Sequence, residues 1–139
     1  MEDSNMENNM ITTLDGFLKK TFTHTFLTDL LCTAAYGSFW FSVSYRDHNP
    51  ADMVEAARNL HDCREDIWAE ILLRGGNICI TDEEEEKDHI LNLEDIKRGF
   101  ALVMFNHPSM YQAIMDETFD LYDADAVIQC AVFGELTYG

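Results

Sequence analysis

The chain has 139 residues, of which 47% are hydrophobic and 12% aromatic, and its 26 Asp and Glu against 9 Lys and Arg give a formal net charge of −17. Disordered acidic segments are poor in aromatic residues, so this composition excludes a chain that is no more than an acidic tail. No apolar run reaches the ~20 residues that span a bilayer, and the acidic start differs from the basic start of a signal peptide. We therefore expect a flexible N-terminus over residues 1–9 and a single domain over residues 10–139, in the cytoplasm.

The first predicted element is a long helix that begins at Thr12 or Thr13 and ends near Gly37. Leucine and phenylalanine recur at helical spacing on both sides of an alternating stretch at residues 21–26, and glycine commonly ends a helix. The next segment, residues 38–45, largely alternates serine with aromatic or aliphatic residues. That pattern leaves two alternatives open, a strand or the start of an aromatic-rich helix.

Two further helices are predicted in the middle of the chain. Asn49 and Pro50 are a typical cap and first residue of a helix, which extends to Leu60. The second helix has an apolar face and ends at the glycine pair 75–76, where Arg74 suits the negative end of the helix dipole.

A hairpin follows these helices. Residues 77–81 and 89–93 are predicted to be strands, and the acidic run Asp82–Asp88 between them is then the tip of a β-hairpin. Three more helices are expected: one from Leu93, one from Pro108 and a last one capped by Asp123. The predicted fold class is α+β, a small helical domain of five to six helices with one β-hairpin.

No local motif marks a catalytic or metal site. The segment Asp120–Asp125 lacks the central glycine of a calcium loop, and a helix would place His61 and Cys63 on different faces. The other histidines stand singly, and the four cysteines lack the close pairs of a zinc site. Direct binding of DNA or RNA is not expected with 9 basic residues. We expect no enzymatic activity, no cofactor and no bound metal.

Four ordered blocks of the sequence resemble a group of small acidic proteins carried by bacteriophages and mobile elements. The blocks are residues 26–38 with Trp40, residues 68–75, residues 91–96 with Gly99, and residues 123–139. The resemblance brings no catalytic motif. It implies a setting, an accessory gene of a virus or element in conflict with its bacterial host, and a protein in that host's cytoplasm. The chain departs from the group at Ser38 and Phe39, where a second glycine and a tyrosine are more common.

The uneven charge suggests a function. Residues 82–139 carry 14 acidic and 3 basic residues, a net −11. Carboxylates three or four residues apart on a helix lie about 5 to 6 Å apart, close to the spacing of successive phosphates. Our leading hypothesis is a non-enzymatic inhibitor that mimics nucleic acid and enters the basic groove of a host nucleic-acid-handling defence protein, of the anti-CRISPR or anti-restriction type. The acidic residues assigned to this surface are Asp82, Glu83, Glu84, Glu85, Glu86, Asp88, Glu94, Asp95, Asp116, Glu117, Asp120, Asp123 and Asp125.

An alternative hypothesis is a protein–protein interaction or assembly module, for example a homodimer, that acts through the aromatic segment 39–45. Two alternating faces cannot be buried equally in so small a sheet, so part of this segment is expected at the surface. The residues assigned to it are Phe39, Trp40 and Phe41. Neither hypothesis involves a membrane.

Overall fold

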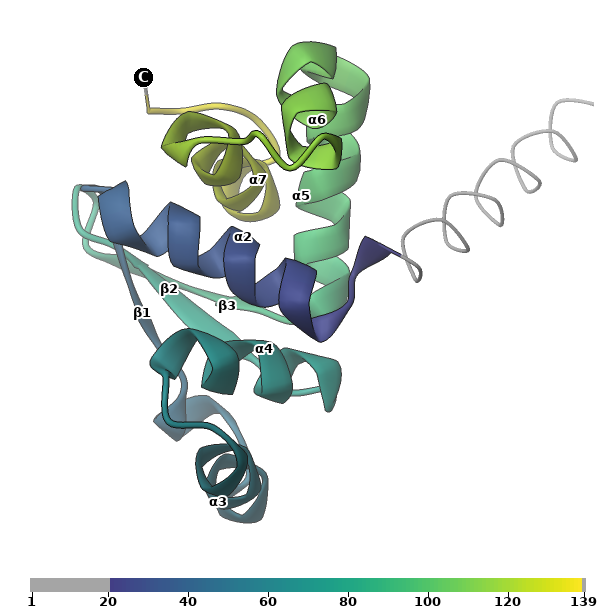
Figure 1. The fold of residues 1–139 in the computed structure, drawn as a ribbon. Helices are drawn as coiled ribbons and strands as arrows, with labels where there is room; N and C mark the ends of the chain where they lie inside the picture. The colour runs from purple at the N-terminus through teal and green to yellow at the C-terminus, as the bar shows by residue number, and fades with distance from the viewer. Residues whose placement is uncertain (1–20, 139) are drawn as a thin grey trace, which may run out of the picture.

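The computed structural model describes residues 21–138, which form six α-helices and one three-stranded antiparallel sheet (Figure 1). In chain order the elements are α2 (His24–Gly37), β1 (Phe41–Ser44), a 3-10 helix (Arg46–His48), α3 (Ala51–Leu60), α4 (Arg64–Leu73), β2 (Ile78–Asp82), β3 (Lys87–Leu91), α5 (Leu93–Asn106), α6 (Pro108–Met115) and α7 (Leu121–Phe133). The predicted α+β class is confirmed, and the sheet has one strand beyond the hairpin. No helix within the described range is long and apolar enough to cross a membrane.

The extra strand is β1, which resolves the alternatives left open for residues 38–45. It pairs antiparallel with β2, so the strands lie in the order β1-β2-β3. Phe41 and Val43 face the same side as Ile80 of β2, whereas Ser42 and Ser44 face the other side. Figure 1 shows α2 and α4 in front of the strands, so helices cover the apolar face of the sheet.

The main core lies between that sheet face and helices α2, α5 and α7, and its largest fully buried side chains include Trp40 and Phe100. Gly99 of α5 lies against the backbone of α7. A Cβ atom on Gly99 would lie 2.7 Å from the backbone nitrogen of Ala131 and would also contact the carbonyl oxygen of Val127. The absence of a side chain at Gly99 therefore permits the short distance between these two helices.

The prediction of one long first helix is wrong at Phe22 and Thr23, which are not helical. Helix α2 begins at His24, because the Thr23 hydroxyl accepts a hydrogen bond from the Phe26 backbone nitrogen at 3.2 Å and caps the helix. Phe22 is buried and packs edge-on against Phe26 and Phe100. The predicted segments 1–9 and 10–20 lie outside the described residues.

The cap of α3 also differs from the prediction. Pro50 rather than Asn49 is the N-cap of α3. The Asn49 side chain instead donates to the carbonyl oxygens of Tyr45 and Asn77 and accepts from the Asn77 nitrogen, at 2.7 to 2.8 Å. Asn49 therefore joins the 3-10 helix to the start of β2, a role for which the local sequence offers no pattern.

Candidate functional site

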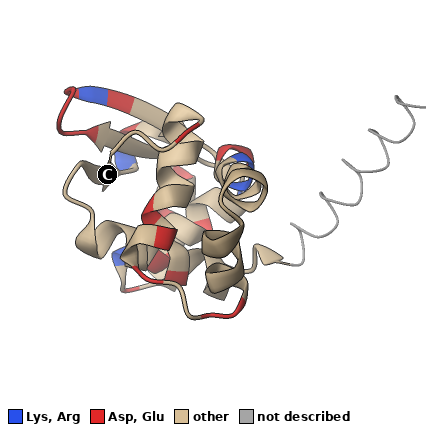
Figure 2. Cartoon of the chain, turned by 90° about the horizontal axis from the view of Figure 1, so that it is seen from above, with Lys and Arg blue, Asp and Glu red and all other residues tan. Residues whose placement is uncertain are grey.

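The acidic run forms the tip of the β2–β3 hairpin, as predicted. Glu83, Glu84, Glu85 and Glu86 make the turn between the strands, and all four are exposed. Figure 2 shows this turn in red at one edge of the molecule. Glu86 has a φ of 55°, in the left-handed region that favours glycine. The turn therefore holds a backbone conformation that costs an ordinary residue about 1 kcal/mol.

Asp82 does not belong to the exposed tip, which corrects its assignment as a partner-binding residue. It is fully buried, and its Oδ1 accepts hydrogen bonds from the backbone nitrogens of Glu84 at 2.9 Å and Glu85 at 3.2 Å. The Tyr138 hydroxyl donates to Oδ1 at 3.0 Å and to Oδ2 at 2.9 Å. Asp82 therefore fixes the turn from inside the protein.

Two other segments help to hold the turn. The backbone nitrogen of Glu83 donates to the carbonyl oxygen of Trp40 at 2.7 Å, just before β1. Burial of the Tyr138 phenol, its hydrogen bond to Asp82 and the nearby glutamates raise the pKa of Tyr138 to about 12. The hydroxyl therefore keeps its proton, and with it the hydrogen bond, at neutral pH.

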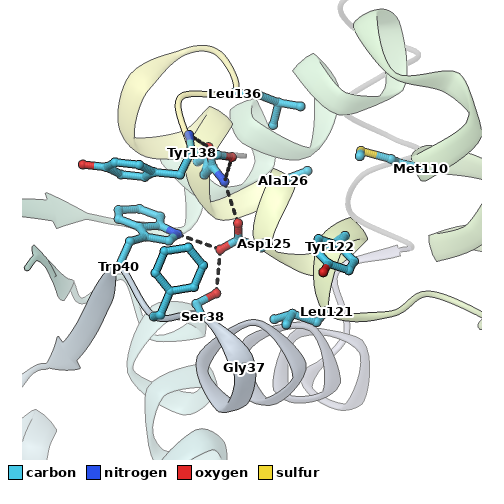
Figure 3. Close-up of a pocket in the computed structure, with 12 residues that line it drawn as sticks. Gly37, Ser38, Trp40, Met110, Leu121, Tyr122, Asp125, Ala126, Leu136 and Tyr138 are labelled. Atoms are coloured by element: carbon cyan, nitrogen blue, oxygen red, sulfur yellow. Dashed lines mark hydrogen bonds between the residues drawn. The ribbon is translucent and has the colours of Figure 1, made fainter. Parts of the chain in front are cut away.

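Beside the hairpin lies a mostly apolar cleft of about 210 Å³. Figure 3 shows its lining, which comes from the α2–β1 connection, α6, α7 and the segment after α7. The lining residues are Gly37, Ser38, Phe39, Trp40, Met110, Leu121, Tyr122, Asp125, Ala126, Gln129, Leu136 and Tyr138. Phe39 and Tyr122 are 76% and 67% exposed and Leu136 is 37% exposed, so the rim of the cleft presents apolar side chains to solvent.

Asp125 lies in this cleft and is engaged by neighbouring donors. Its Oδ1 accepts from the Ser38 hydroxyl at 2.6 Å and from the Trp40 indole nitrogen at 2.7 Å, and its Oδ2 accepts from the Gln129 amide at 2.5 Å. Asp125 therefore ties the α2–β1 connection to α7, instead of lying on an open acidic face as predicted. The Ser38 hydroxyl makes the shorter of the two contacts to its Oδ1.

Gln129 extends this network to the end of the chain, and sequence reasoning missed it. It is 3% exposed, and its Oε1 accepts from the backbone nitrogens of Thr137 at 2.7 Å and Tyr138 at 2.8 Å. The amide nitrogen donates to Asp125 and to the Tyr138 carbonyl oxygen. Gln129 is the one polar residue in the apolar stretch 126–133 of α7, which is the sequence signal that could have found it.

The aromatic residues divide between core and surface. Trp40 is 1% exposed and Phe41 is 8% exposed, so neither is accessible to a partner, which corrects their assignment to a surface patch. Both lie under the hairpin end of the sheet, with their rings 4.7 Å apart. Phe39 alone of the three is exposed, and it lies on the rim of the cleft.

The other predicted acidic residues do not join the tip in one surface. Glu94 and Asp95 follow the far end of β3, at the opposite end of that strand from the turn. Both are paired locally, with Lys97 at 3.4 Å and with Arg98 at 2.8 Å. Glu94 and Asp95 therefore form a separate and largely neutralised site.

Asp120 and Asp123 have a structural role at the start of α7. Asp120 is the N-cap, and the two side chains form a capping box in which each accepts from the other's backbone nitrogen at 3.1 Å. The predicted cap, Asp123, is thus the third helical residue rather than the cap itself. Burial and the adjacent Asp120 carboxylate raise the pKa of Asp123.

Asp116 and Glu117 are exposed in the connection between α6 and α7. Glu117 lines a shallow hollow with α2 side chains between Thr25 and Thr33, whereas α2 contributes its last residue, Gly37, to the cleft beside the tip. Figure 2 accordingly shows red segments on several sides of the molecule. The exposed acidic tip itself consists of Glu83–Glu86, with the exposed Asp88 next to it on β3.

One group of metal-binding side chains comes together that the sequence did not suggest. Within residues 21–138, one group of three His, Cys, Asp or Glu side chains lies close enough together to share an ion. It consists of His24, His61 and Glu70. The His61 hydrogen bond lowers the pKa of Glu70, burial acts against it, and Arg74 lowers it further. These residues come from the start of α2, the residue after α3 and the middle of α4, so no spacing in the sequence links all three.

Comparison of the chain with protein-family models, with curated proteins and with solved structures finds no match.

Proposed function

We propose that this chain is a non-enzymatic inhibitor from a bacteriophage or mobile element, which binds a basic nucleic-acid-handling defence protein of the host through its acidic hairpin tip. The single observation that carries the proposal is the way the tip is held. Four consecutive exposed glutamates stand on a turn whose backbone is fixed by the buried carboxylate of Asp82.

Both the charge of the tip and the order of its backbone favour binding to a basic partner. Neighbouring carboxylates about 6 Å apart repel by ~0.7 kcal/mol per pair in water, so a solvated turn gains nothing from four of them. Internal hydrogen bonds fix the backbone of the turn that carries these carboxylates, which lowers the backbone entropy lost when a partner binds. Guanidinium groups in a nucleic-acid groove recognise such oxygens by charge-assisted hydrogen bonds.

The adjoining cleft supplies the apolar part of the same surface. Phe39, Tyr122 and Leu136 are exposed around it, and Trp40 contacts both the cleft and the turn. Charges steer a partner toward the site, and well-packed apolar contacts commonly supply most of the affinity. In the proposed complex the tip contacts basic side chains and the cleft rim packs against their aliphatic parts.

The test compares two variants with the same change in net charge. One reverses Glu83, Glu84, Glu85 and Glu86 to lysine, and the other reverses four exposed acidic residues elsewhere, Asp52, Glu55, Asp116 and Glu117. Each protein is used to pull down partners from host lysate, and is assayed against purified CRISPR effectors and restriction enzymes at physiological salt. The proposal expects the tip variant to lose binding and inhibition and the control variant to keep most of both. Equal loss in both variants would show that net charge, not the position of the glutamates, determines binding, and would contradict the proposal. Unchanged binding by the tip variant would contradict it as well.

The second candidate function is an assembly module, now centred on the cleft rim instead of the buried Trp40 and Phe41. The observation that favours it is the exposure of Phe39 and Tyr122, at 76% and 67%, beside one apolar cleft. Sedimentation of the wild type against the Phe39→Ser and Tyr122→Ser double variant tests it. A dimer that the double variant abolishes and the tip reversal preserves would favour this function over the first.

A further inference from the structure

His24, His61, Asp66 and Glu70 converge where three helices meet. His24 is the first residue of α2, His61 directly follows α3, and the two acidic residues lie one turn apart on α4. The two imidazole rings are stacked with their centroids 4.8 Å apart. From this juxtaposition we propose a binding site for a divalent transition metal of the zinc class.

The two contact pairs in this cluster have the spacing of neighbouring metal ligands. His24 Nε2 lies 3.2 Å from Asp66 Oδ1, and His61 Nε2 lies 2.9 Å from Glu70 Oε1. Two ligand atoms about 2.0 to 2.1 Å from a tetrahedral zinc ion are themselves about 3.3 Å apart. Each pair therefore already has nearly the separation that one ion requires.

A small movement brings the two histidines and Glu70 onto one ion. The ligand atoms of His24, His61 and Glu70 all lie within 4.8 Å of one another, so closing the set means shifts of about 1.5 Å or less. The side chains of His24 and Asp66 are 33% and 35% exposed, which leaves them room to adjust. Those of His61 and Glu70 are less exposed, at 23% and 20%, and provide the fixed half of the site.

The donor atoms of this cluster are of the types that bind a first-row transition metal. Imidazole nitrogen and carboxylate oxygen are the donors that zinc shares with neighbouring first-row metals. Arg74 Nε donates to Glu70 Oε2 at 2.8 Å, which orients the carboxylate and leaves Oε1 directed at His61. Such a hydrogen bond to the non-ligating oxygen is typical of the residues that support a metal site.

Binding at this position would also act on the fold. Helix α3 packs on α4 through the small apolar cluster of Ala57, Ile67 and Ile71, apart from the main core. A metal held by His24, His61 and Glu70 would connect the end of α3 to α2 and α4 at once. Because an ion that binds only the folded state stabilises it, zinc should raise the melting temperature.

The experiment uses the full chain, purified without a histidine tag and freed of metal by a chelator. Zinc is titrated by calorimetry, and cobalt(II) serves as a spectroscopic probe of tetrahedral coordination. We expect one equivalent to bind, a higher melting temperature with zinc, and cobalt ligand-field bands without a thiolate charge-transfer band. His24→Ala, His61→Ala and the isosteric Glu70→Gln should each weaken binding at least tenfold. His107→Ala, the same substitution at a histidine outside the cluster, should leave the affinity unchanged.

Circular dichroism of the metal-free variants checks that they fold. If a histidine variant does not fold, the isosteric Glu70→Gln variant still tests the site. The absence of one-to-one binding would overturn the proposal. Binding that all three variants leave intact would overturn it as well, as would a thiolate band that assigns the ion to cysteine. None of these outcomes depends on whether the acidic tip binds a partner.

Discussion

The hydroxyl of Tyr138 donates to both carboxylate oxygens of Asp82, 56 residues earlier in the chain, at 3.0 and 2.9 Å. The same carboxylate accepts hydrogen bonds from the backbone nitrogens of Glu84 and Glu85. The shape of an exposed turn is thus set by a buried acid and a tyrosine near the other end of the sequence. The contribution of this contact to the shape of the tip can therefore be tested by substituting Tyr138, which lies outside the tip itself.

The Tyr138→Phe variant should have a lower melting temperature than the wild type at pH 7, and the difference should vanish in alkali. The folded state raises the pKa of Tyr138 from its ordinary 10 to about 12, because it disfavours the phenolate. The stabilisation by this contact is therefore complete below pH 10 and is lost as the pH rises toward about 12.

Melting temperatures of both proteins between pH 7 and pH 12 check this prediction. Tyr122→Phe is the matched control, because it removes the hydroxyl of a tyrosine that is 67% exposed. If the difference in melting temperature between the wild type and Tyr138→Phe stayed constant through this range, the contact with Asp82 would not raise the pKa of Tyr138 as described.

The Asp125→Ala variant should lower the free energy of unfolding by about 2 to 3 kcal/mol, because it removes the acceptor of buried or half-buried donors. These donors are the Ser38 hydroxyl, the Trp40 indole nitrogen and the Gln129 amide. Urea unfolding measures the loss, and the indole N–H resonance of Trp40 should shift. Asp116→Ala, at an exposed acid, should change stability by less than about 0.5 kcal/mol, and an equal loss in both variants would refute the role of the network.

The same substitution at two helical glycines should have different costs. Gly99→Ala should lower the free energy of unfolding by about 2 kcal/mol, since the new methyl group would meet the backbone of α7. At Gly37 the nearest atoms belong to the Leu121 side chain, which can rotate away, so Gly37→Ala should cost less than about 1 kcal/mol. Chemical denaturation of both variants measures the contrast, and a larger cost at Gly37 would mean that the α5–α7 contact is looser than described.

The two aspartates of the α7 capping box should respond differently to the loss of their charge. Asp120→Ala removes the N-cap acceptor and should lower stability by about 1 kcal/mol. Asp123→Asn keeps an acceptor for the Asp120 nitrogen, and it removes a charge that the fold disfavours, since burial raises the pKa of Asp123. That variant should be as stable as the wild type at pH 7 or slightly more so. Urea unfolding checks the pair, and an equal loss in Asp123→Asn would show that the ionised carboxylate is required.

The elements that the sequence predicted well are those with local signals. Periodic apolar residues located most of the helices, and the paired strands around the acidic run located the hairpin and its tip. The break at Thr23 was missed because a single threonine cap competes with an otherwise continuous helical pattern. Strand β1 remained ambiguous because four residues with aromatic neighbours do not distinguish a strand from a helix start.

The candidate site was less predictable, because its contacts join distant parts of the chain. Among the acidic residues, nothing local distinguishes Asp82, which points inward, from Glu83, which is exposed. Trp40 was assigned to a surface because its hydrogen bond partner, Asp125, lies 85 residues away. His24 and His61 are likewise adjacent only because the start of α2 and the end of α3 meet beside α4.

The network around Asp125 has a consequence for the order in which the molecule assembles and opens. Ser38, Trp40 and Asp82 each contact a partner that is between 56 and 87 residues further along the chain. Such contacts close long loops and form only once α7 and the segment after it have docked. When α7 detaches, the cleft loses one wall and the hairpin turn loses an anchor in the same event. Hydrogen exchange in the turn should therefore follow the end of α7 rather than its own strands, so that tip and cleft open as one cooperative unit.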